Sequence, residues 1–154
     1  MPEITIYTDG AAKGNPGNGG YGAVMMSGNH KKELSEGYRN TTNNRMELLS
    51  VIVALETIKI ENAIVQIFSD SKYVVDSVEK GWVFGWQKKG FKGKKNIDLW
   101  QRFLKIYPKH TIKFNWVKGH AGNLYNERCD ELAVQSAERP DLLVDEGYEK
   151  QIKG

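Results

Sequence analysis

The sequence predicts an α/β domain in which helices cover both faces of a mixed β-sheet. Three observations support this fold class. Residues 4–38 contain alternating and β-branched segments separated by short turns, which is typical of antiparallel strands. Residues 64–68 are a short apolar run, the pattern of a strand buried on both faces. Elsewhere apolar residues recur at helical spacing, so the expected order of elements is βββαβααβα.

Three strands form the N-terminal part of the predicted sheet. We expect the first over residues 4–8, stopped by Asp9-Gly10 and followed by a glycine-rich loop over residues 14–22. The second and third strands are expected over residues 20–26 and 32–38. Their short connections predict an antiparallel meander.

The chain then changes to a helical period. Apolar residues such as Leu48 and Ile52 lie at helical spacing. They predict a helix over residues 43–59, with Asn43 or Asn44 as its N-cap. The elements that follow are expected, in order, as a strand over residues 64–68, a helix from Ser71, a helix over residues 97–106, a strand over residues 111–117 and a helix over residues 125–137.

The chain has 154 residues, a length that fits one domain. We expect this domain to span residues 1–140 and to include a basic protrusion at about residues 80–95. Pro140 ends the last helix of the pattern. Residues 141–154 are therefore expected to form a loosely ordered C-terminal tail.

The composition excludes several classes of protein. Apolar residues make up 40% and charged residues 27%, as in ordinary globular proteins. The sequence contains neither an apolar run of ~18 residues, which a membrane helix needs, nor the pattern of a secretory signal. Because Cys129 is the single cysteine, no intramolecular disulfide can form, which suits a reducing compartment. We therefore expect a cytoplasmic protein, and a monomer without a protein partner.

Positive charge is concentrated in residues 80–95. The net charge of the chain is +3, yet this segment holds six lysines and no acidic residue, so the remainder is mildly acidic. Trp82 and Trp86 lie four residues apart, on one face of a helix. We expect the lysines to bind phosphates, and the tryptophans to contact sugars or pack the base of the segment, with at least one in the core. A nucleic acid is the leading candidate partner, although a lysine run is also typical of a solvated surface.

Four carboxylates stand out by their positions. Asp9 follows the first predicted strand, and Asp70 follows the strand over residues 64–68. If these strands are parallel neighbours, their ends lie ~4.8 Å apart, and the two carboxylates converge where α/β sheets bind ligands. Glu47 lies near the start of a strongly apolar helix, and Asp130 lies in the final helix.

Converging carboxylates repel one another, and a cation relieves this repulsion. Oxygen ligands without histidine or cysteine favour Mg²⁺ or Mn²⁺ over zinc, and two such ions can activate a water to attack a phosphodiester. Each carboxylate taken singly also fits a structural role: a hairpin turn at Asp9-Gly10, an N-cap at Asp70, a favourable helix-dipole contact at Glu47 and a solvated position at Asp130.

A series of short motifs spans nearly the whole chain, from residue 4 to about residue 137. In chain order they are Tyr7-Thr8-Asp9-Gly10, Gly14-Asn15-Pro16-Gly17, Thr41-Thr42-Asn43-Asn44-Arg45-Met46-Glu47-Leu48, Ser69-Asp70-Ser71, Asp98-Leu99-Trp100, Trp116-Val117-Lys118-Gly119-His120-Ala121-Gly122 and Asn126-Glu127-Arg128-Cys129-Asp130-Glu131-Leu132-Ala133. As an ordered set they resemble the bacterial type 1 class of ribonuclease H. This resemblance implies a five-stranded mixed sheet with helices on both faces. It also implies hydrolysis of the RNA strand of RNA–DNA hybrids by two metal ions, leaving 5′-phosphate and 3′-hydroxyl ends.

The resemblance implies catalytic roles for individual residues. Asp9, Glu47, Asp70 and Asp130 match the four metal-binding carboxylates of the family, with Mg²⁺ as the expected ion and Mn²⁺ as a possible substitute. His120, between glycines, matches a histidine that assists proton movement or product release, a task suited to an imidazole with a pKa of about 6.5.

Other residues match the family's nucleic-acid contacts. Asn15, Asn43 and Asn44 are expected to line a groove that senses the 2′-OH, with Thr42 near a DNA phosphate. In the basic protrusion, the residues expected to grip the DNA strand are Trp82, Trp86, Lys88 and Lys89. The chain departs from the usual family pattern at Lys72 and Asp76, where glutamine is common, and this departure concerns contacts to the RNA strand.

Two rival functions follow from the same residues. A junction resolvase or exonuclease of the same superfamily has similar carboxylates but needs no 2′-OH, and the asparagines Asn15, Asn43 and Asn44 argue against it. A non-catalytic module that binds hybrids or duplexes has no need of four carboxylates, and all four are present.

Overall fold

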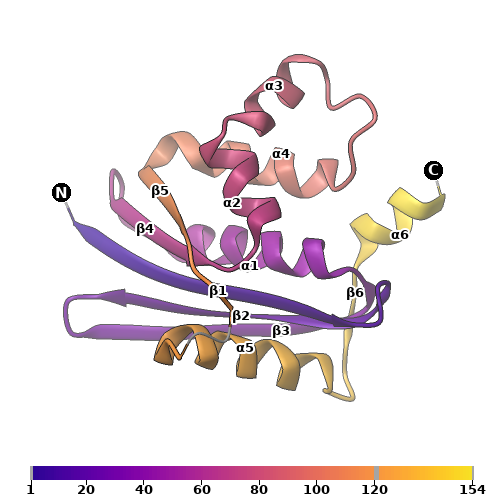
Figure 1. Ribbon diagram of the computed structural model, residues 1–154, viewed down its shortest axis with the longest axis horizontal. Coiled ribbons are helices and arrows are strands. Elements are labelled where there is room, and N and C mark those ends of the chain that lie inside the picture. Colours follow the sequence, from indigo (N-terminus) through magenta and orange to yellow (C-terminus); the bar gives the residue numbers. More distant parts are fainter. Residues whose placement is uncertain (1, 120–121, 154) are drawn as a thin grey trace.

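Three long antiparallel strands form the centre of the sheet (Figure 1). β1 (Glu3–Lys13) pairs with β2 (Gly17–Ser27), and β2 pairs with β3 (His30–Thr41). The computed structural model in which this arrangement is seen describes residues 2–119 and 122–153. The predicted N-terminal meander is thereby confirmed.

Parallel strands extend the sheet on both sides of this meander. β4 (Ile64–Ser69) pairs with β1, and β5 (Thr111–Trp116) pairs with β4, so the carboxyl ends of these strands meet at one edge. On the other side β6 (Leu143–Val144) pairs with β3, giving the order β5-β4-β1-β2-β3-β6. The predicted five-stranded sheet thus gains a sixth strand. The sequence pattern missed it because it has only two residues, both of them exposed.

Helices cover both faces of the sheet, as predicted. α5 (Leu124–Ala137) lies on one face, and the remaining long helices lie on the other (Figure 1). Those helices are α1 (Asn43–Thr57), α2 (Lys72–Glu79), α3 (Trp82–Lys88) and α4 (Ile97–Ile106), which is followed by a 3₁₀ turn (Tyr107–Lys109). Each helix within the described ranges is too short or too polar to cross a lipid bilayer.

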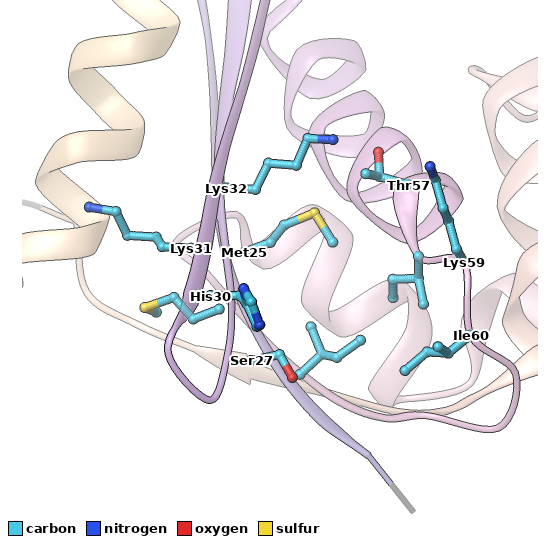
Figure 2. A pocket seen from close by; sticks show the side chains of 11 residues that line it. Met25, Ser27, His30, Lys31, Lys32, Thr57, Lys59 and Ile60 are labelled. Atoms are coloured by element: carbon cyan, nitrogen blue, oxygen red, sulfur yellow. The ribbon is translucent and has the colours of Figure 1, made fainter.

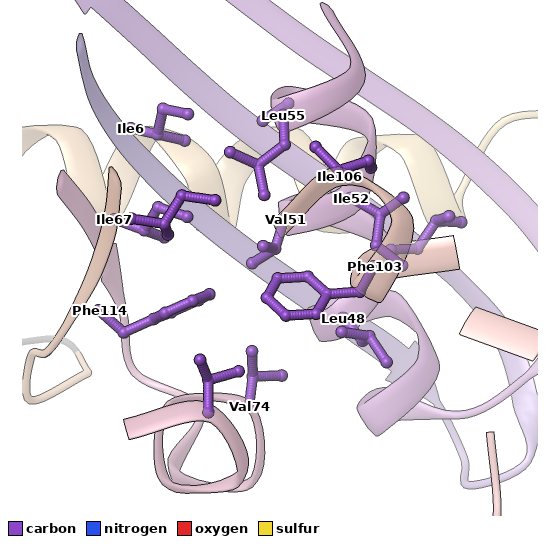
Figure 3. Close-up of a cluster of buried hydrophobic side chains, with 14 of the residues drawn as sticks. Ile6, Leu48, Val51, Ile52, Leu55, Ile67, Val74, Phe103, Ile106 and Phe114 are labelled. Carbon is purple, nitrogen blue, oxygen red and sulfur yellow. The ribbon is translucent and has the colours of Figure 1, made fainter. Parts of the chain in front are cut away.

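The main core lies between the sheet and the helices on the α1 face. Side chains of α1 such as Leu48 and Ile52 meet Ile67 of β4, Phe114 of β5 and Phe103 of α4 (Figure 3). α1 is buried over most of its circumference because it lies between the sheet and other helices. Burial of this kind fixes the positions of the inward-facing side chains of α1, and Glu47 is one of them.

α5 packs closely against β2 because that strand presents glycines to it. A Cβ at Gly20 would lie 2.5 Å from the carbonyl oxygen of Ala133, and one at Gly22 would lie 2.5 Å from that of Cys129. The glycine-rich loop expected over residues 14–22 ends earlier, because residues 17–19 already belong to β2, and the strand expected from residue 20 is confirmed. Glycine weakens the strand pattern in the sequence, but here the missing side chains admit the helix.

β1 also runs further than predicted. Asp9 and Gly10 do not stop it, since they pair with Gly22 and Tyr21 of β2. The hairpin-turn interpretation of Asp9-Gly10 is accordingly wrong, and the turn lies at residues 14–16. The ladder can continue because Asp9 directs its side chain away from the strand pairing, which uses only backbone groups.

Two N-caps differ from the predictions. The N-cap of α1 is Thr42, whose Oγ1 accepts a hydrogen bond from the backbone N–H of Arg45 at 3.2 Å, rather than Asn43 or Asn44. The N-cap of α2 is Ser71, whose Oγ accepts from the N–H of Val74 at 3.2 Å, rather than Asp70. Hydroxyl and amide side chains are comparable caps, so propensity alone does not choose among neighbouring candidates.

The C-terminal tail, expected to be loosely ordered, packs against the body of the domain. After β6 the chain forms α6 (Glu146–Lys153), and Tyr148 is buried. Asp145, between the two elements, accepts hydrogen bonds from Thr41 Oγ1 at 2.6 Å and from Nε of Arg45 at 2.9 Å. Arg45, 1% exposed, also donates to Asp98 of α4 at 2.7 Å. This buried ion-pair network holds the tail, and its partners lie too far apart in the chain for the sequence to reveal it.

Candidate functional site

Three carboxylates meet at the carboxyl edge of the parallel strands. Asp9 lies in β1, Glu47 in the second turn of α1, and Asp70 directly after β4. Each offers an oxygen within 4.8 Å of an oxygen of the others. Asp9 is 6% exposed and Glu47 is 5% exposed, so two of the three charges are taken out of water.

The sheet register brings Asp9 and Asp70 together. Tyr7 of β1 pairs with Phe68 of β4, and their rings stack with centroids 4.8 Å apart. Asp9 lies two residues after Tyr7, and Asp70 lies two residues after Phe68. The two strands are parallel neighbours, which is the condition under which the two carboxylates were expected to converge.

Gly10 allows Glu47 to approach Asp9. A Cβ on Gly10 would lie 2.3 Å from the backbone nitrogen of Glu47 and 2.3 Å from the carbonyl carbon of Met46. Any larger residue would therefore push the start of α1 away from β1. The glycine that follows Asp9 is thus a condition for the carboxylate cluster.

Burial and mutual repulsion make the cluster unfavourable as free anions. Burial, followed by the charge of Asp70, raises the pKa of Asp9 to about 8, and the charge of Asp130 adds to the rise. The N–H of Gly10 donates a hydrogen bond to Asp9 Oδ1 at 2.9 Å, and this bond offsets part of the rise in the pKa of Asp9. Burial, and then the charges of Asp9 and Asp70, raise the pKa of Glu47 well above its ordinary value.

The donor set of the cluster fits a hard divalent cation. Glu47 Oε1 is buried and has no hydrogen-bond partner among the described residues. An unpaired buried carboxylate oxygen is costly, and coordination of a cation removes that cost. Carboxylate oxygens alone, without histidine or cysteine, are typical ligands of Mg²⁺ and Mn²⁺.

Asp130 and His120 stand in different relations to this cluster. Asp130, half-buried on α5, is outside the group of three, although its charge reaches Asp9 and raises that residue's pKa. His120 lies outside the described residues. Its neighbour Gly119 lies against Asp70, because a Cβ there would be 2.8 Å from Asp70 Oδ2.

The polar residues predicted to contact nucleic acid meet at the start of α1. Asn15 lies in the turn between β1 and β2, and its Oδ1 accepts a hydrogen bond from the N–H of Asn43 at 3.1 Å. Thr42 caps the helix, and Asn43 and Asn44 are exposed in its first turn. These four residues therefore form one surface a few residues before Glu47.

The basic protrusion is α3 and the loop that follows it. Trp82 is 46% exposed, whereas Trp86 packs on the buried Trp100 with ring centroids 6.0 Å apart. The expectation that at least one of these tryptophans belongs to the core is thus confirmed. Lys88 and Lys89 are exposed at the end of α3.

Trp116 lies beside the cluster, although it is not among the predicted site residues. Its Nε1 donates to the carbonyl oxygen of Asp70 at 3.1 Å, and its side chain remains 47% exposed. Lys72 places its Nζ 4.8 Å from the centre of the Trp116 ring. The position of Trp116 at the end of β5, next to β4, was the available indication.

A second groove, of about 490 Å³, lies at the other end of β1 (Figure 2). It lies between the β2–β3 turn, with His30 and Lys32, and the segment after α1, with Lys59 and Ile60. Met25 contributes to its apolar floor. Since it contains none of the predicted site residues, the carboxylate edge remains the candidate site.

The chain is similar to a group of nucleases. The family model described as RNase H matches residues 1–138. A protein named Ribonuclease H from Desulforamulus reducens is 56% identical over 150 residues, covering 94% of each chain. One named Ribonuclease HI from Synechocystis is 48% identical over 153 residues, covering 96% of this chain and 95% of the relative.

Solved structures show the same likeness. LC9-RNase H1, described as a type 1 RNase H with the type 2 active-site motif, superimposes with a TM-score of 0.80 at 32% identity, over 97% of this chain and 80% of the other. LC11-RNase H1, solved in complex with an RNA/DNA hybrid, gives a TM-score of 0.65 at 28% identity, over 88% of this chain and 96% of the other.

Proposed function

The chain belongs to the RNase H family, and on this basis we propose how its residues carry out the family's reaction. The protein is a metal-dependent endoribonuclease that hydrolyses the RNA strand of RNA–DNA hybrids. Its products, in our proposal, carry 5′-phosphate and 3′-hydroxyl ends. The observation that carries the residue assignment is the meeting of Asp9, Glu47 and Asp70 within 4.8 Å.

Asp9, Glu47 and Asp70 hold the divalent ions, which are Mg²⁺ in our proposal, with Mn²⁺ as a substitute. Two bound ions supply Lewis acidity at the scissile phosphate and a lower pKa for the attacking water. Gly10 orients Asp9 through its N–H, and burial in α1 fixes Glu47. Asp130 completes the site from α5, where its negative charge already reaches Asp9.

His120 is assigned by the family motif to proton movement or product release. A group that titrates near neutral pH suits this task, since it can take up and return a proton during turnover. This assignment rests on the resemblance.

Recognition of the hybrid is assigned to two surfaces. Asn15, Asn43 and Asn44 contact the groove that displays the 2′-OH, and Thr42 contacts a DNA phosphate. Support comes from their common place at the start of α1, directly before Glu47. The second surface is the basic protrusion, where Trp82, Lys88 and Lys89 contact the DNA strand and Trp86 packs its base.

A non-catalytic binding module is disfavoured by the energetics of the cluster. Burial of Asp9 and Glu47 side by side destabilises the folded protein without a cation, and binding of a hybrid alone gives no reason to keep such an arrangement. We also propose that the protein acts in the cytoplasm as a monomer.

Cleavage of a labelled RNA strand tests the proposal. Wild-type protein and Mg²⁺ are mixed with the hybrid, with duplex DNA or with duplex RNA, and the hybrid reaction is repeated in EDTA and with Mn²⁺. We expect cutting of the hybrid alone, loss of cutting in EDTA, and 5′-phosphate ends on the products. Cleavage of both duplexes as fast as of the hybrid would favour the resolvase or exonuclease alternative, and binding without cutting would favour the binding module.

A further inference from the structure

Trp116 is a large aromatic residue that the fold leaves exposed at the carboxylate edge. It is the last residue of β5, at the outer edge of the sheet, and it pairs in register with Ser69, the residue before Asp70. Trp116 is 47% exposed, whereas Phe114, two residues earlier on the same strand, is 3% exposed. Packing in the core therefore does not account for an indole ring beside Asp70.

A hydrogen bond fixes the orientation of this ring. Trp116 Nε1 donates to the backbone carbonyl oxygen of Asp70 at 3.1 Å, so rotation of the indole about its side-chain bonds is restricted. A flat ring that is already oriented before a ligand binds loses little conformational entropy on binding. Trp116 thus offers a preorganised apolar surface directly beside a carboxylate of the cluster.

Lys72 places a cation on this aromatic surface. Its Nζ lies 4.8 Å from the centre of the Trp116 ring, which is a cation–π geometry. Lys72 is also the first residue of α2, where the helix dipole disfavours a positive charge. Asp76, one turn later, pairs with Lys80 at 3.6 Å, and Lys72 has no ion-pair partner within the part of the chain that the structure describes. The ammonium group can therefore bind an anionic ligand without breaking an ion pair of the fold.

The carboxylate cluster lies between this pair and the proposed 2′-OH contacts. The sheet order β5-β4-β1 sets Trp116, Asp70 and Asp9 side by side along one edge, with neighbouring strands about 4.8 Å apart. Asn15, in the turn from β1 to β2, and the start of α1, directly after β3, lie toward the opposite side of the sheet. A nucleic-acid strand that contacts Asn15 and crosses the cluster along this edge therefore passes over Trp116.

We propose that Trp116 and Lys72 form a binding contact for the RNA strand at the nucleotide next to the scissile phosphate. The strand that crosses the cluster is the one that is cut, and its bases are paired with DNA, so the indole ring meets a ribose. Lys72 Nζ donates to the phosphate of the same nucleotide. This proposal rests on the proposed function, and it adds two residues that the assignments above do not include.

Two substitutions of Trp116 separate a ring contact from a structural role. Trp116→Leu removes the flat ring, whereas Trp116→Phe keeps a flat ring but lacks the N–H that bonds to Asp70. We expect Trp116→Leu to raise the Kd of the hybrid in EDTA and the KM in Mg²⁺ about tenfold, with kcat within about threefold of wild type. The Kd of Trp116→Phe should stay within about threefold of wild type. Both variants should keep the wild-type Tm, because the ring is exposed.

Two outcomes of this comparison would overturn the proposal. The first is an unchanged Kd and KM for Trp116→Leu. The second is a Kd for Trp116→Phe as high as that for Trp116→Leu, since the bond from Nε1 to Asp70, rather than the ring, would then carry the effect.

Lys72→Gln tests the phosphate contact. It removes the charge but keeps a polar side chain, and it should reduce the slope of log Kd against log salt in magnitude by about one. Lys113→Gln is the matched control, because Lys113 is exposed on the same strand as Trp116 but on the opposite face of the sheet. The slope for Lys113→Gln should equal that of wild type. An equal change of slope in both variants would reveal an effect of net charge and overturn the contact.

Hybrids with one uncharged methylphosphonate linkage identify the strand that Lys72 contacts. The linkage is moved along the RNA strand in one series and along the DNA strand in the other, and Kd is measured in EDTA. At one position in the RNA strand, we expect the neutral linkage to weaken binding by wild-type protein but not to weaken binding by Lys72→Gln any further. The same pattern in the DNA series alone, or in neither series, would overturn the proposal.

The Kd measurements also distinguish failure of this proposal from failure of the proposed function. Wild-type protein that bound the hybrid without cutting it would contradict the proposed function, whereas the Kd values of Trp116→Leu and Trp116→Phe would still decide whether the ring contact exists. Cleavage by wild-type protein, together with unchanged Kd and KM for Trp116→Leu, would remove the contact and leave the proposed function intact.

Discussion

Tyr7 of β1 and Phe68 of β4 are register partners with stacked rings, and this pairing sets Asp9 and Asp70 at the same level of the sheet. Asp9 remains in a continuous strand, whereas the chain turns after Asp70 toward α2. The edge of two parallel strands thus supplies two carboxylates, and Glu47 of α1 supplies the third.

The pH dependence of stability should reveal the repulsion at Asp9. The pKa of Asp9 rises from 3.8 to about 8 in the folded protein, so this residue's contribution to stability is full below pH 4 and is lost as the pH rises toward 8. In EDTA, Asp9→Asn should therefore be more stable than wild type at pH 8, by about 2 kcal/mol, and this difference should vanish near pH 4. Urea denaturation between about pH 4 and pH 8 measures this difference in stability. Saturating Mg²⁺ should remove the greater stability of the variant at pH 8. A variant less stable than wild type at pH 8 in EDTA would show that Asp9 has a structural role.

Gly10→Ala should separate α1 from β1. The added Cβ would lie 2.3 Å from backbone atoms of Met46 and Glu47, which cannot yield as a flexible side chain would. We expect a loss of at least about 2 kcal/mol of stability together with weaker metal binding, measured by urea denaturation and calorimetric titration. Gly85→Ala in α3, where a Cβ meets nothing within 4 Å, is the matched control and should be neutral or stabilising by about 0.5–1 kcal/mol. Equal stabilities of the two variants would refute this account of Gly10.

Asp145→Asn should release the C-terminal helix. Arg45 is almost fully buried and would keep only Asp98 as an anionic partner, so we expect a loss of about 3 kcal/mol in the free energy of unfolding. Hydrogen exchange should show faster exchange in α6 before global unfolding. Asp141→Asn, at an exposed position, serves as the control. Unchanged exchange in α6 of Asp145→Asn would mean that other contacts hold the helix.

Replacing Lys88 and Lys89 together by alanine should weaken binding of the hybrid through the loss of phosphate contacts. Both side chains are exposed on the basic protrusion, so folding should be little affected. We expect the slope of log Kd against log salt to fall in magnitude by about one to two, as measured by fluorescence anisotropy in EDTA. The double variant of Lys31 and Lys32, at the far end of the sheet, makes the same charge change. If both double variants lowered the slope equally, the effect would come from net charge rather than from contacts at the protrusion.

Much of the site follows from local patterns in the sequence. Two short apolar runs that end in aspartate predict adjacent strand ends, and parallel pairing then brings Asp9 and Asp70 together. The helical period predicts the helix that carries Glu47, whereas the close approach of that helix to Gly10 is known only from the structure. The strands and the helix are predictable because each pattern depends on residues close together in the chain.

Features that depend on distant partners were missed. The bond between Arg45 and Asp145 joins residues 100 positions apart, and nothing near Asp145 distinguishes it from a solvated aspartate. The local pattern therefore predicts a loose tail, although the chain forms β6 and α6 there. Residues 17–19, at the start of β2, were also missed, because Gly17 and Gly19 weaken the strand pattern, while their close contacts are with Lys13, Ala11 and Thr41 elsewhere in the sheet. In both cases tertiary contacts override the local pattern.

The most direct test of the central claim is cleavage by Asp9→Asn in Mg²⁺, with hybrid binding measured on the same protein. If the three carboxylates hold the catalytic ions, single-turnover cleavage should fall about 1,000-fold while the Kd of the hybrid stays within about twofold of wild type. Asp141→Asn should cleave at the wild-type rate. Cleavage by Asp9→Asn within a few-fold of wild type would contradict the assignment of this cluster as the metal site.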